Sequence, residues 1–488
     1  MQKQDGKKFT SSLLFTAGLS ILVGIIIMLI PIPQSLREVA EAVPARNADL
    51  GWRLLAIFVA TIVALILKPF PMGTVSFIAI TLLAVTRTLS IGVALSGFAN
   101  TVIWLIVCAF FISKGFVKTG LGQRIAYLFM KAFGKKTLGL SYSFIVSDLV
   151  MAPAMPSNTA RIGGILYPII RSLANVFGSK TEDKTERKVG SFLIYTTFQA
   201  DNVVSAMFMT AMAANPLTVQ IAYEVLGLQI SWMQWAVAAF VPGIVTLAIL
   251  PFLLYKIYPP EIKETPEAAE IAKEKLKEMG PLSKKEKMMM FVFFQILVLW
   301  IFGPNFGIGA TTTALIGLST MLILGILTFD DIKAEQSAWD TLVWFAALVM
   351  MATQLNTLGV IPWFSYSVES AVSGFSWIVA FAIIALAYFY SHYFFASATA
   401  HVSAMYGALL LASVSLGAPP LFAALVLAFF SSLYMGLTHY GTGSAPVYFG
   451  SGYITQGDWW GYAFLVSLVN ITIWVFVGGL WWRILGLW

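Results

Sequence analysis

Charged residues are scarce in this chain of 488 residues: 11% are Asp, Glu, Lys or Arg, whereas 59% are hydrophobic. Soluble domains carry about 25% charged residues, so the composition excludes an ordinary soluble domain. Apolar runs of roughly 20 residues, the length that crosses a bilayer, recur from residue 11 to the end of the chain. The sequence therefore predicts an all-α, polytopic membrane protein with about eleven transmembrane helices.

Cysteine and histidine are also rare. Cys108 is the single cysteine, so no intramolecular disulfide can form. The three histidines, His392, His401 and His439, form no HExxH pattern, and the chain has no GxxxxGK[ST] phosphate loop. These absences argue against a metal site, a cofactor, an ATP-driven pump and an activated nucleophile. We therefore do not expect an enzyme.

Basic residues are missing from a long part of the chain, since no Lys or Arg lies between Lys333 and Arg483. Most of them, 22 of 30, fall in four segments, residues 3–8, 114–136, 171–188 and 256–287. Such clustering is typical of the positive-inside rule and indicates that these segments and the amino terminus are cytoplasmic. The net charge of +7 then needs no nucleic acid partner, because the lipid bilayer explains where the charges lie.

Two short motifs recur at the same spacing. TVIW at 101–104 matches TLVW at 341–344, and SNTA at 157–160 matches SATA at 397–400, so both pairs have the same offset. Two matches at one offset, in segments of equal hydropathy, indicate an internal duplication. Because the first copy contains an odd number of crossings, the second copy is expected to be inverted in the membrane.

The chain is accordingly divided into four parts. These are a first transmembrane helix with an external loop (1–52), a first inverted repeat (53–257), a cytoplasmic linker (258–287) and a second inverted repeat (288–488). The linker mixes Glu and Lys and is interpreted as a solvated connector, with a surface helix as the alternative.

Each repeat is expected to contain a re-entrant hairpin. In residues 138–172, two apolar arms of about 13 residues flank the proline-containing tip APAMPSNTA and are too short to cross. Lys135 and Arg171 place both ends of this hairpin on the cytoplasmic side. The corresponding segment 377–416 has no basic flanks and is expected to open outward. Inverted repeats with broken helices that meet near the midplane are typical of secondary transporters.

The two tips carry small hydrogen-bonding side chains. Ser157, Asn158 and Thr159 in one tip, and Ser397 and Thr399 in the other, offer neutral donors beside the amino terminus of a half-helix, where an anion is favoured. Two such tips suit a substrate with two carboxylates. The alternatives are that these residues only cap a helix, and that SATA only provides close helix packing.

Other segments are expected to complete the cavity. Gly441 and Gly443 in HYGTGSAPVYFGSGY (439–453) indicate an unwound helix in which Thr438 and Thr442 are donors. Asp201, in FQADNVVSAMF (198–208), either serves the cavity or is a buried structural acceptor.

Arg161 and His401 are separated by the same offset, each just after its tip. We hypothesise that they supply fixed positive charge where a cation-coupled relative binds Na⁺. A carrier with such charges is unfavourable to move unloaded, which predicts obligatory exchange. Alternatively, Arg161 pairs with an acid such as Asp148, and His401 is a satisfied buried histidine.

PSNTAR at 156–161, SATAH at 397–401 and THYGTGSAPVYFGSGY at 438–453 together resemble the divalent anion/sodium symporter (DASS) family. The branch of citrate/succinate, tartrate/succinate and 2-oxoglutarate/malate antiporters is similar over nearly the whole chain. The resemblance implies an eleven-span, elevator-type homodimer in which both tips bind substrate carboxylates. Sodium-coupled members carry a second SNT, whereas this chain has Ala398 at its centre, which weakens the case for a sodium site.

The sequence thus predicts a plasma-membrane, Na⁺-independent exchanger of di- and tricarboxylates such as 2-oxoglutarate, malate, succinate or citrate. The alternatives are a Na⁺-coupled dicarboxylate symporter of the same fold, a channel, and an intramembrane enzyme. The residues expected at the substrate are Ser157, Asn158, Thr159, Ser397, Ala398, Thr399, Thr442 and Gly443.

Overall fold

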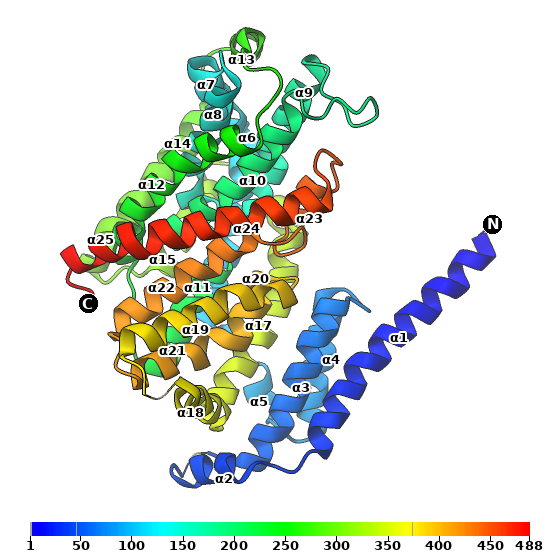
Figure 1. Cartoon of the computed structure of the whole chain (residues 1–488), viewed down its shortest axis with the longest axis vertical. Helices are drawn as coiled ribbons and strands as arrows, with labels where there is room; N and C mark the ends of the chain where they lie inside the picture. The colour runs from blue at the N-terminus through cyan, green and yellow to red at the C-terminus, as the bar shows by residue number, and fades with distance from the viewer. Residues whose placement is uncertain (1, 45, 373) are drawn as a thin grey trace.

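The computed structural model describes residues 2–44, 46–372 and 374–488, and side chains from residue 14 onward. The described part is helical throughout, which confirms the predicted all-α class (Figure 1). Nine described helices are long and apolar enough to cross a membrane, or ten if the bent pair α1 and α2 forms one span. The chain is therefore a multi-pass membrane protein, and the count of eleven stays a prediction.

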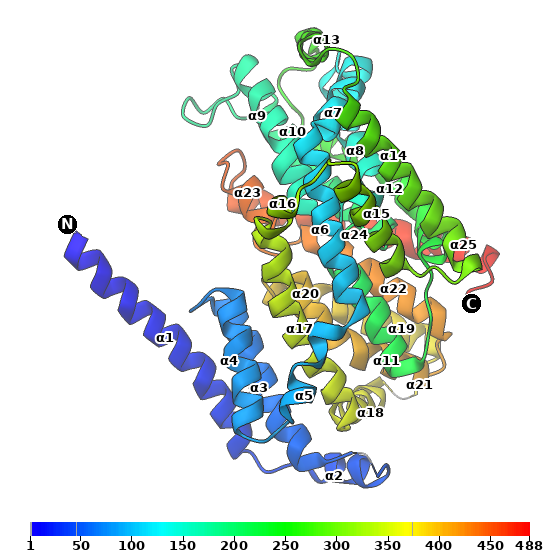
Figure 2. The same cartoon turned by 180° about the vertical axis from the view of Figure 1, so that it is seen from behind.

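The amino-terminal helices lie to one side of the molecule (Figures 1 and 2). They are α1 (Gln2–Leu29), α2 (Gln34–Glu41), α3 (Ala48–Leu67), α4 (Met72–Val85) and α5 (Ile91–Ala94). The first half continues with α6 (Thr101–Thr119), α7 (Leu121–Phe133), α8 (Thr137–Met151), η2 (Ala152–Ala154), the π-helical η3 (Thr159–Leu166), α9 (Tyr167–Val176), α10 (Gly190–Met207), α11 (Ala214–Leu226) and α12 (Trp232–Ile257).

The second half repeats this order. Its helices are α14 (Lys284–Phe302), α15 (Ala310–Ile323), α16 (Phe329–Lys333), α17 (Gln336–Thr357), α18 (Val360–Val372), α19 (Trp377–Ser391), η5 (His392–Phe394), α20 (Ala398–His401), the π-helical η6 (Val402–Tyr406), α21 (Gly407–Ser415), α22 (Pro420–Leu433), η7 (Tyr434–Gly436), α23 (Ala445–Phe449), α24 (Gln456–Ile473), η8 (Trp474–Gly478) and α25 (Gly479–Ile484). The helix α19 begins and ends at the residues that correspond to the two ends of α8, and η5 corresponds to η2 in the same way. The offset is the one that separates the two tip motifs.

This constant offset does not continue beyond the two broken segments. The helix α10 ends at Met207, and its counterpart, α22 with η7, ends at Gly436, so these ends are closer in the sequence than the tips are. Residues 198–208 therefore correspond to 427–437 and not to 439–453, the segment that the constant offset would give. The stretch with no regular helix in the first half is 208–213, not the Asp201 region.

The first broken segment is longer than the sequence indicated. The helix α8 continues through the turn η2, so that Thr137–Ala154 forms a run of 18 residues, long enough to count as a candidate span. Length alone therefore does not separate a re-entrant arm from a crossing one, and the hairpins stay a prediction. In both views α8 and α9 lie in the upper half with α13, whereas α19 and α21 lie in the lower half with α18 (Figures 1 and 2).

The linker between the halves contains a helix, α13 (Pro266–Met279), so the solvated connector was the wrong alternative for this stretch. Ala268, Ala269 and Ala272 are buried on one face of α13, which packs against α7. Small side chains on one face of a charged helix allow close packing, while Glu and Lys remain on the solvent side.

Two separate apolar clusters hold the helices together. One joins α2, α3, α4 and α5 to α17, and the other contains the helices of the two broken segments. The helix α10 lies deep in the second cluster, where all 18 of its residues are buried. Its polar residues are therefore shielded from lipid, which explains how a span with Gln199, Asp201 and Asn202 is tolerated.

Candidate functional site

One central cavity of about 380 Å³ receives both tips. All eight residues expected at the substrate line it, which are Ser157, Asn158, Thr159, Ser397, Ala398, Thr399, Thr442 and Gly443. Other lining residues come from α3, α4, α6 and α17, among them Leu65, Phe110 and Trp344. The structure thus brings together two segments from different halves of the sequence, between the two apolar clusters.

The two tips are built in the same way. The Oγ of Ser157 accepts a hydrogen bond from the amide of Ala160 (3.2 Å), and the Oγ of Ser397 accepts one from the amide of Ala400 (3.4 Å). Both serines therefore cap a helix start, which is the capping role that the sequence offered as an alternative to substrate binding. A hydroxyl that accepts this bond retains its own hydrogen, so each serine remains able to donate to an anion in the cavity.

Asn158 connects the first tip to the unwound segment between η7 and α23. Its Nδ2 donates to Thr442 Oγ1 (3.1 Å) and to Ser444 Oγ (3.5 Å), and its Oδ1 accepts from the amide of Thr159 (2.8 Å). The amide group of Asn158 is thus used within the protein. Thr442 accepts through its oxygen, which leaves its hydroxyl hydrogen free for a ligand.

Thr159 and Thr399 offer the least committed hydroxyls of the cavity. Among the described residues, neither hydroxyl has a hydrogen-bond partner, although Thr399 is only 8% exposed. Thr438, the other expected donor, does not line the cavity, and its buried Oγ1 is also unpartnered in the described part. Free hydroxyls at a half-buried site favour a ligand with several acceptor oxygens.

Gly443 lies against Thr159, because a Cβ at this position would stand 2.9 Å from the Thr159 Oγ1. We expect Gly443→Ala to push this hydroxyl aside and to raise the KM of transport by about fivefold, corresponding to roughly 1 kcal/mol. Gly164→Ala is the matched control, since a Cβ at Gly164 meets no atom within 4 Å. An unchanged KM in Gly443→Ala, measured in reconstituted vesicles, contradicts the placement of Thr159 at the ligand.

Arg161 is completely buried behind the first tip and does not line the cavity. Its Nε donates to Asp148 Oδ1 (2.7 Å), and its Nη2 donates to Asp201 Oδ1 (2.8 Å). The remaining bonds reach Ser205 Oγ and the backbone oxygens of Met155 and Ala211. Five donors thus have five acceptors, and none remains for a substrate.

The alternative prediction for Arg161, an ion pair with Asp148, is therefore present in the structure. Asp201 is a second partner of the same guanidinium group. Two carboxylates face one guanidinium group, so the positive charge of Arg161 is fully balanced within the protein. The bond to the Met155 oxygen, one residue before Pro156, also holds the tip in place from behind.

His401 is likewise buried and lies outside the cavity lining. Its Nδ1 is 3.2 Å from His392 Nδ1, and its Nε2 is 2.9 Å from Ser391 Oγ. Both ring nitrogens are therefore bonded within the protein, as the satisfied-histidine alternative held. No cluster of three His, Cys, Asp or Glu side chains suited to a metal ion occurs in the described part of the chain.

The sequence analysis did not predict that residues of α3, α4 and α17 line the cavity. Lys68 and Met72, at the junction of α3 and α4, line the cavity together with Trp344 of α17. The repeated motif TVIW/TLVW marked Trp344 as part of the duplication, but not as a cavity residue. The sequence does distinguish Lys68, since it is a single cation between two apolar runs.

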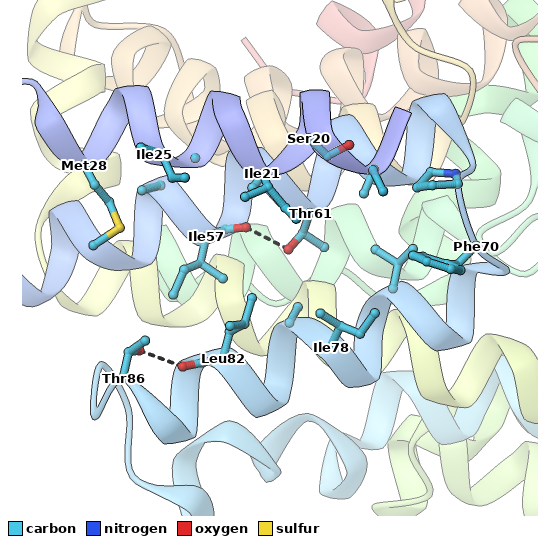
Figure 3. A pocket seen from close by; sticks show the side chains of 18 residues that line it. Ser20, Ile21, Ile25, Met28, Ile57, Thr61, Phe70, Ile78, Leu82 and Thr86 are labelled. Carbon is cyan, nitrogen blue, oxygen red and sulfur yellow. Dashed lines mark hydrogen bonds between the residues drawn. The ribbon is translucent and has the colours of Figure 1, made fainter. Parts of the chain in front are cut away.

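A second cavity, of about 270 Å³, lies between α1, α3 and α4 (Figure 3). Its walls are apolar, and its threonine hydroxyls are engaged. Thr61 donates to the oxygen of Ile57 (2.7 Å), and Thr86 donates to the oxygen of Leu82 (2.6 Å). This cavity has little to offer an anion, so the central cavity is the candidate site.

Comparison with known proteins gives a family match over nearly the whole chain. Residues 11–488 match the family described as the sodium:sulfate symporter transmembrane region. The Bacillus subtilis protein YflS, named as a candidate malate transporter, is 58% identical over 100% of this chain and 99% of its own length. Dicarboxylate transporter 1 of Spinacia oleracea chloroplasts is 50% identical over 96% of this chain and 81% of its own.

A third relative and a solved structure extend the comparison. The L-tartrate/succinate antiporter of Escherichia coli is 36% identical over 90% of this chain and 94% of its own length. The structure of MtrF from Neisseria gonorrhoeae, described as an antimetabolite efflux pump, aligns with a TM-score of 0.56 and 12% identity over 82% of this chain and 84% of that one. At such identity the match shows a shared fold alone.

Proposed function

The chain belongs to the sodium:sulfate symporter transmembrane family, and from this premise we propose that it is a secondary active transporter that exchanges di- and tricarboxylates across the plasma membrane. The observation that carries the proposal is the single cavity into which both tips present uncommitted hydroxyls. The relatives named for malate, dicarboxylates and tartrate/succinate support the same substrate class, which includes 2-oxoglutarate, malate, succinate and citrate.

The arrangement of donors supports a substrate with two carboxylates. Ser157 and Thr159 on one tip, and Ser397 and Thr399 on the other, are matched pairs at corresponding positions. Neutral hydroxyl donors hold a carboxylate firmly without a permanent charge at the tips themselves, so that the substrate is able to leave again.

We propose antiport without Na⁺, with Na⁺-coupled symport as the rival that the family description names. Ala398 supports the first mechanism, because its methyl group cannot coordinate a cation where an asparagine amide oxygen could. The charge-compensating role of Arg161 and His401 stays a prediction. In the structure Arg161 is bonded to two carboxylates, so its part in this proposal is to hold the tip in place rather than to face the substrate.

We also propose that the protein is a homodimer that works by an elevator-type movement, with a cytoplasmic amino terminus. The two apolar clusters support this proposal, since residues packed against each of them line the cavity. The helices α7, α9 and α13, whose sequences carry basic residues, lie in the upper half of both views, consistent with one cytoplasmic end (Figures 1 and 2).

Counterflow in proteoliposomes tests the proposed exchange. Vesicles are loaded with one unlabelled dicarboxylate at a time, and uptake of labelled 2-oxoglutarate is measured in Na⁺ and in choline. We expect uptake only into loaded vesicles and equal rates in both cations. Strict Na⁺ dependence supports the symport rival, whereas uptake into empty vesicles that does not saturate supports a channel. Chemical alteration of the recovered substrate would indicate an enzyme.

A further inference from the structure

The central cavity has one charged wall residue that the proposed function does not yet use. Among the described residues that line the cavity, Lys68 is the one with a charged side chain. It immediately follows α3 and lines the same cavity as the two tips. The hydroxyls of the tips are neutral, so Lys68 is the full positive charge that a bound anion meets there.

The buried cation behind the first tip is already engaged. Arg161 uses all its donors on protein acceptors and is balanced by Asp148 and Asp201. Lys68 is exposed and forms no ion pair in the part of the chain that the structure describes. Its charge is therefore uncompensated by protein and available to a ligand.

The backbone of Lys68 adds a second observation. Lys68 has φ 51° and ψ 48°, the left-handed conformation in which glycine is preferred. This conformation ends α3 directly before Pro69, and a glycine would adopt it without strain. A positive φ also occurs at Arg87 and Lys184, so this conformation determines where α3 ends and does not by itself give the side chain a role.

An ordinary explanation is that Lys68 only ends the helix or helps to orient the chain in the membrane. Arg87 offers a comparison, because it also has a positive φ of 54° after an apolar helix, α4. Arg87, however, does not line the central cavity. The two residues share backbone conformation, charge and exposure, and differ in their position relative to the cavity.

We propose that Lys68 is the cation that holds an anionic substrate in the central cavity, acting from the junction of α3 and α4. The inference rests on the proposed function for the identity of the substrate, but the charge itself would attract any small dianion. One carboxylate would accept hydrogen bonds from tip hydroxyls while the lysine ammonium group neutralises negative charge across the cavity. Lys68 would thus determine that dianions are preferred over neutral or singly charged analogues.

The test uses the full-length protein with Lys68→Gln, Lys68→Gly and Lys68→Arg, and with Arg87→Gln as the matched control. Exchange of labelled succinate is measured in proteoliposomes at several salt concentrations. We expect Lys68→Gln and Lys68→Gly to raise the KM roughly tenfold, as expected for a lost charge-assisted hydrogen bond in a wet cavity. Lys68→Arg should stay close to the wild type, and Arg87→Gln should not change the KM.

Salt dependence separates a charge effect from a structural one. The KM of the wild type should rise with ionic strength because salt screens an exposed lysine, whereas the KM of Lys68→Gln should rise less. Lys68→Gly should unfold at no lower temperature than the wild type, since glycine relieves the left-handed strain. Equal KM values and equal salt dependence in the wild type and Lys68→Gln would overturn the proposal, as would a Lys68→Gly that loses stability while its KM is unchanged.

A direct binding measurement separates this proposal from the proposed function. Succinate and sulfate are titrated into each detergent-solubilised variant, and the dissociation constants are compared. If the wild type binds sulfate but exchanges no dicarboxylate, the proposed function fails, and a weaker sulfate affinity in Lys68→Gln still supports the role of Lys68. Unchanged affinity for both anions in Lys68→Gln refutes the proposed role of Lys68.

Discussion

Replacing Arg161 by leucine is expected to prevent the protein from folding stably. The substitution leaves Asp148 and Asp201 buried without their cation, and removing one partner of a buried ion pair costs about 3–5 kcal/mol. It also frees the backbone oxygens of Met155, just before the first tip, and of Ala211, between α10 and α11. A cost of this size is comparable with the whole stability of many proteins, about 5–15 kcal/mol.

Size-exclusion chromatography and thermal unfolding in detergent measure this effect. Arg37→Leu is the control, because Arg37 is exposed and lies 3.7 Å from Asp49 in a solvent-accessible pair, which is expected to contribute little. A triple variant with Arg161→Leu, Asp148→Asn and Asp201→Asn should recover part of the lost stability, since it removes the unpaired charges as well. If Arg161→Leu instead folds as well as the wild type and loses only transport, the result supports the hypothesis that Arg161 supplies fixed positive charge in place of Na⁺.

Removing both uncommitted threonine hydroxyls is expected to abolish measurable exchange at ordinary substrate concentrations. Each of Thr159→Ala and Thr399→Ala removes a donor to a charged group, which costs about 1–3 kcal/mol of binding. If the two tips hold two different carboxylates, the losses should add in the double variant, giving about 2–6 kcal/mol. A dissociation constant raised roughly 30-fold to 10⁴-fold would follow.

Binding of succinate to the two single variants and the double variant forms a complete double-mutant cycle. Thr81→Ala is the control, because Thr81 is exposed on α4 and donates to the oxygen of Phe77 in its own helix. Strongly non-additive losses would place both hydroxyls on the same carboxylate. Wild-type affinity in both single variants would remove the tips from the site altogether.

Local sequence patterns predicted the features that depend on neighbouring residues. Hydropathy indicated many apolar helices, and the internal repeat predicted two matching tips with the same serine cap. The same amide-to-serine bond at Ser157 and Ser397 shows why this worked, since a helix start is determined by the few residues around it. The shared position of both tips in one cavity followed from the duplication and not from any single motif.

Local patterns failed where the partner is distant in the chain. The linker was expected to be a solvated connector, but it contains the helix α13. The buried alanines of α13 pack against α7, and this partner belongs to the first half of the chain, so no local pattern indicated it. The offset between the halves also shortens between the tips and the end of α22 with η7, which no short motif recorded.

The sequence by itself determined that this chain is a multi-pass helical membrane protein with two related halves and two polar tips, because hydropathy and helix capping are properties of contiguous residues. Only the tertiary structure decided which charges line the central cavity and which are paired within the protein. Asp148 and Asp201, 13 and 40 residues from Arg161, enclose its guanidinium group, whereas Lys68, from another helix, remains open to the cavity. Electrostatic interactions fall off with distance in space and not along the chain, so a charge acquires its role only when the helices pack.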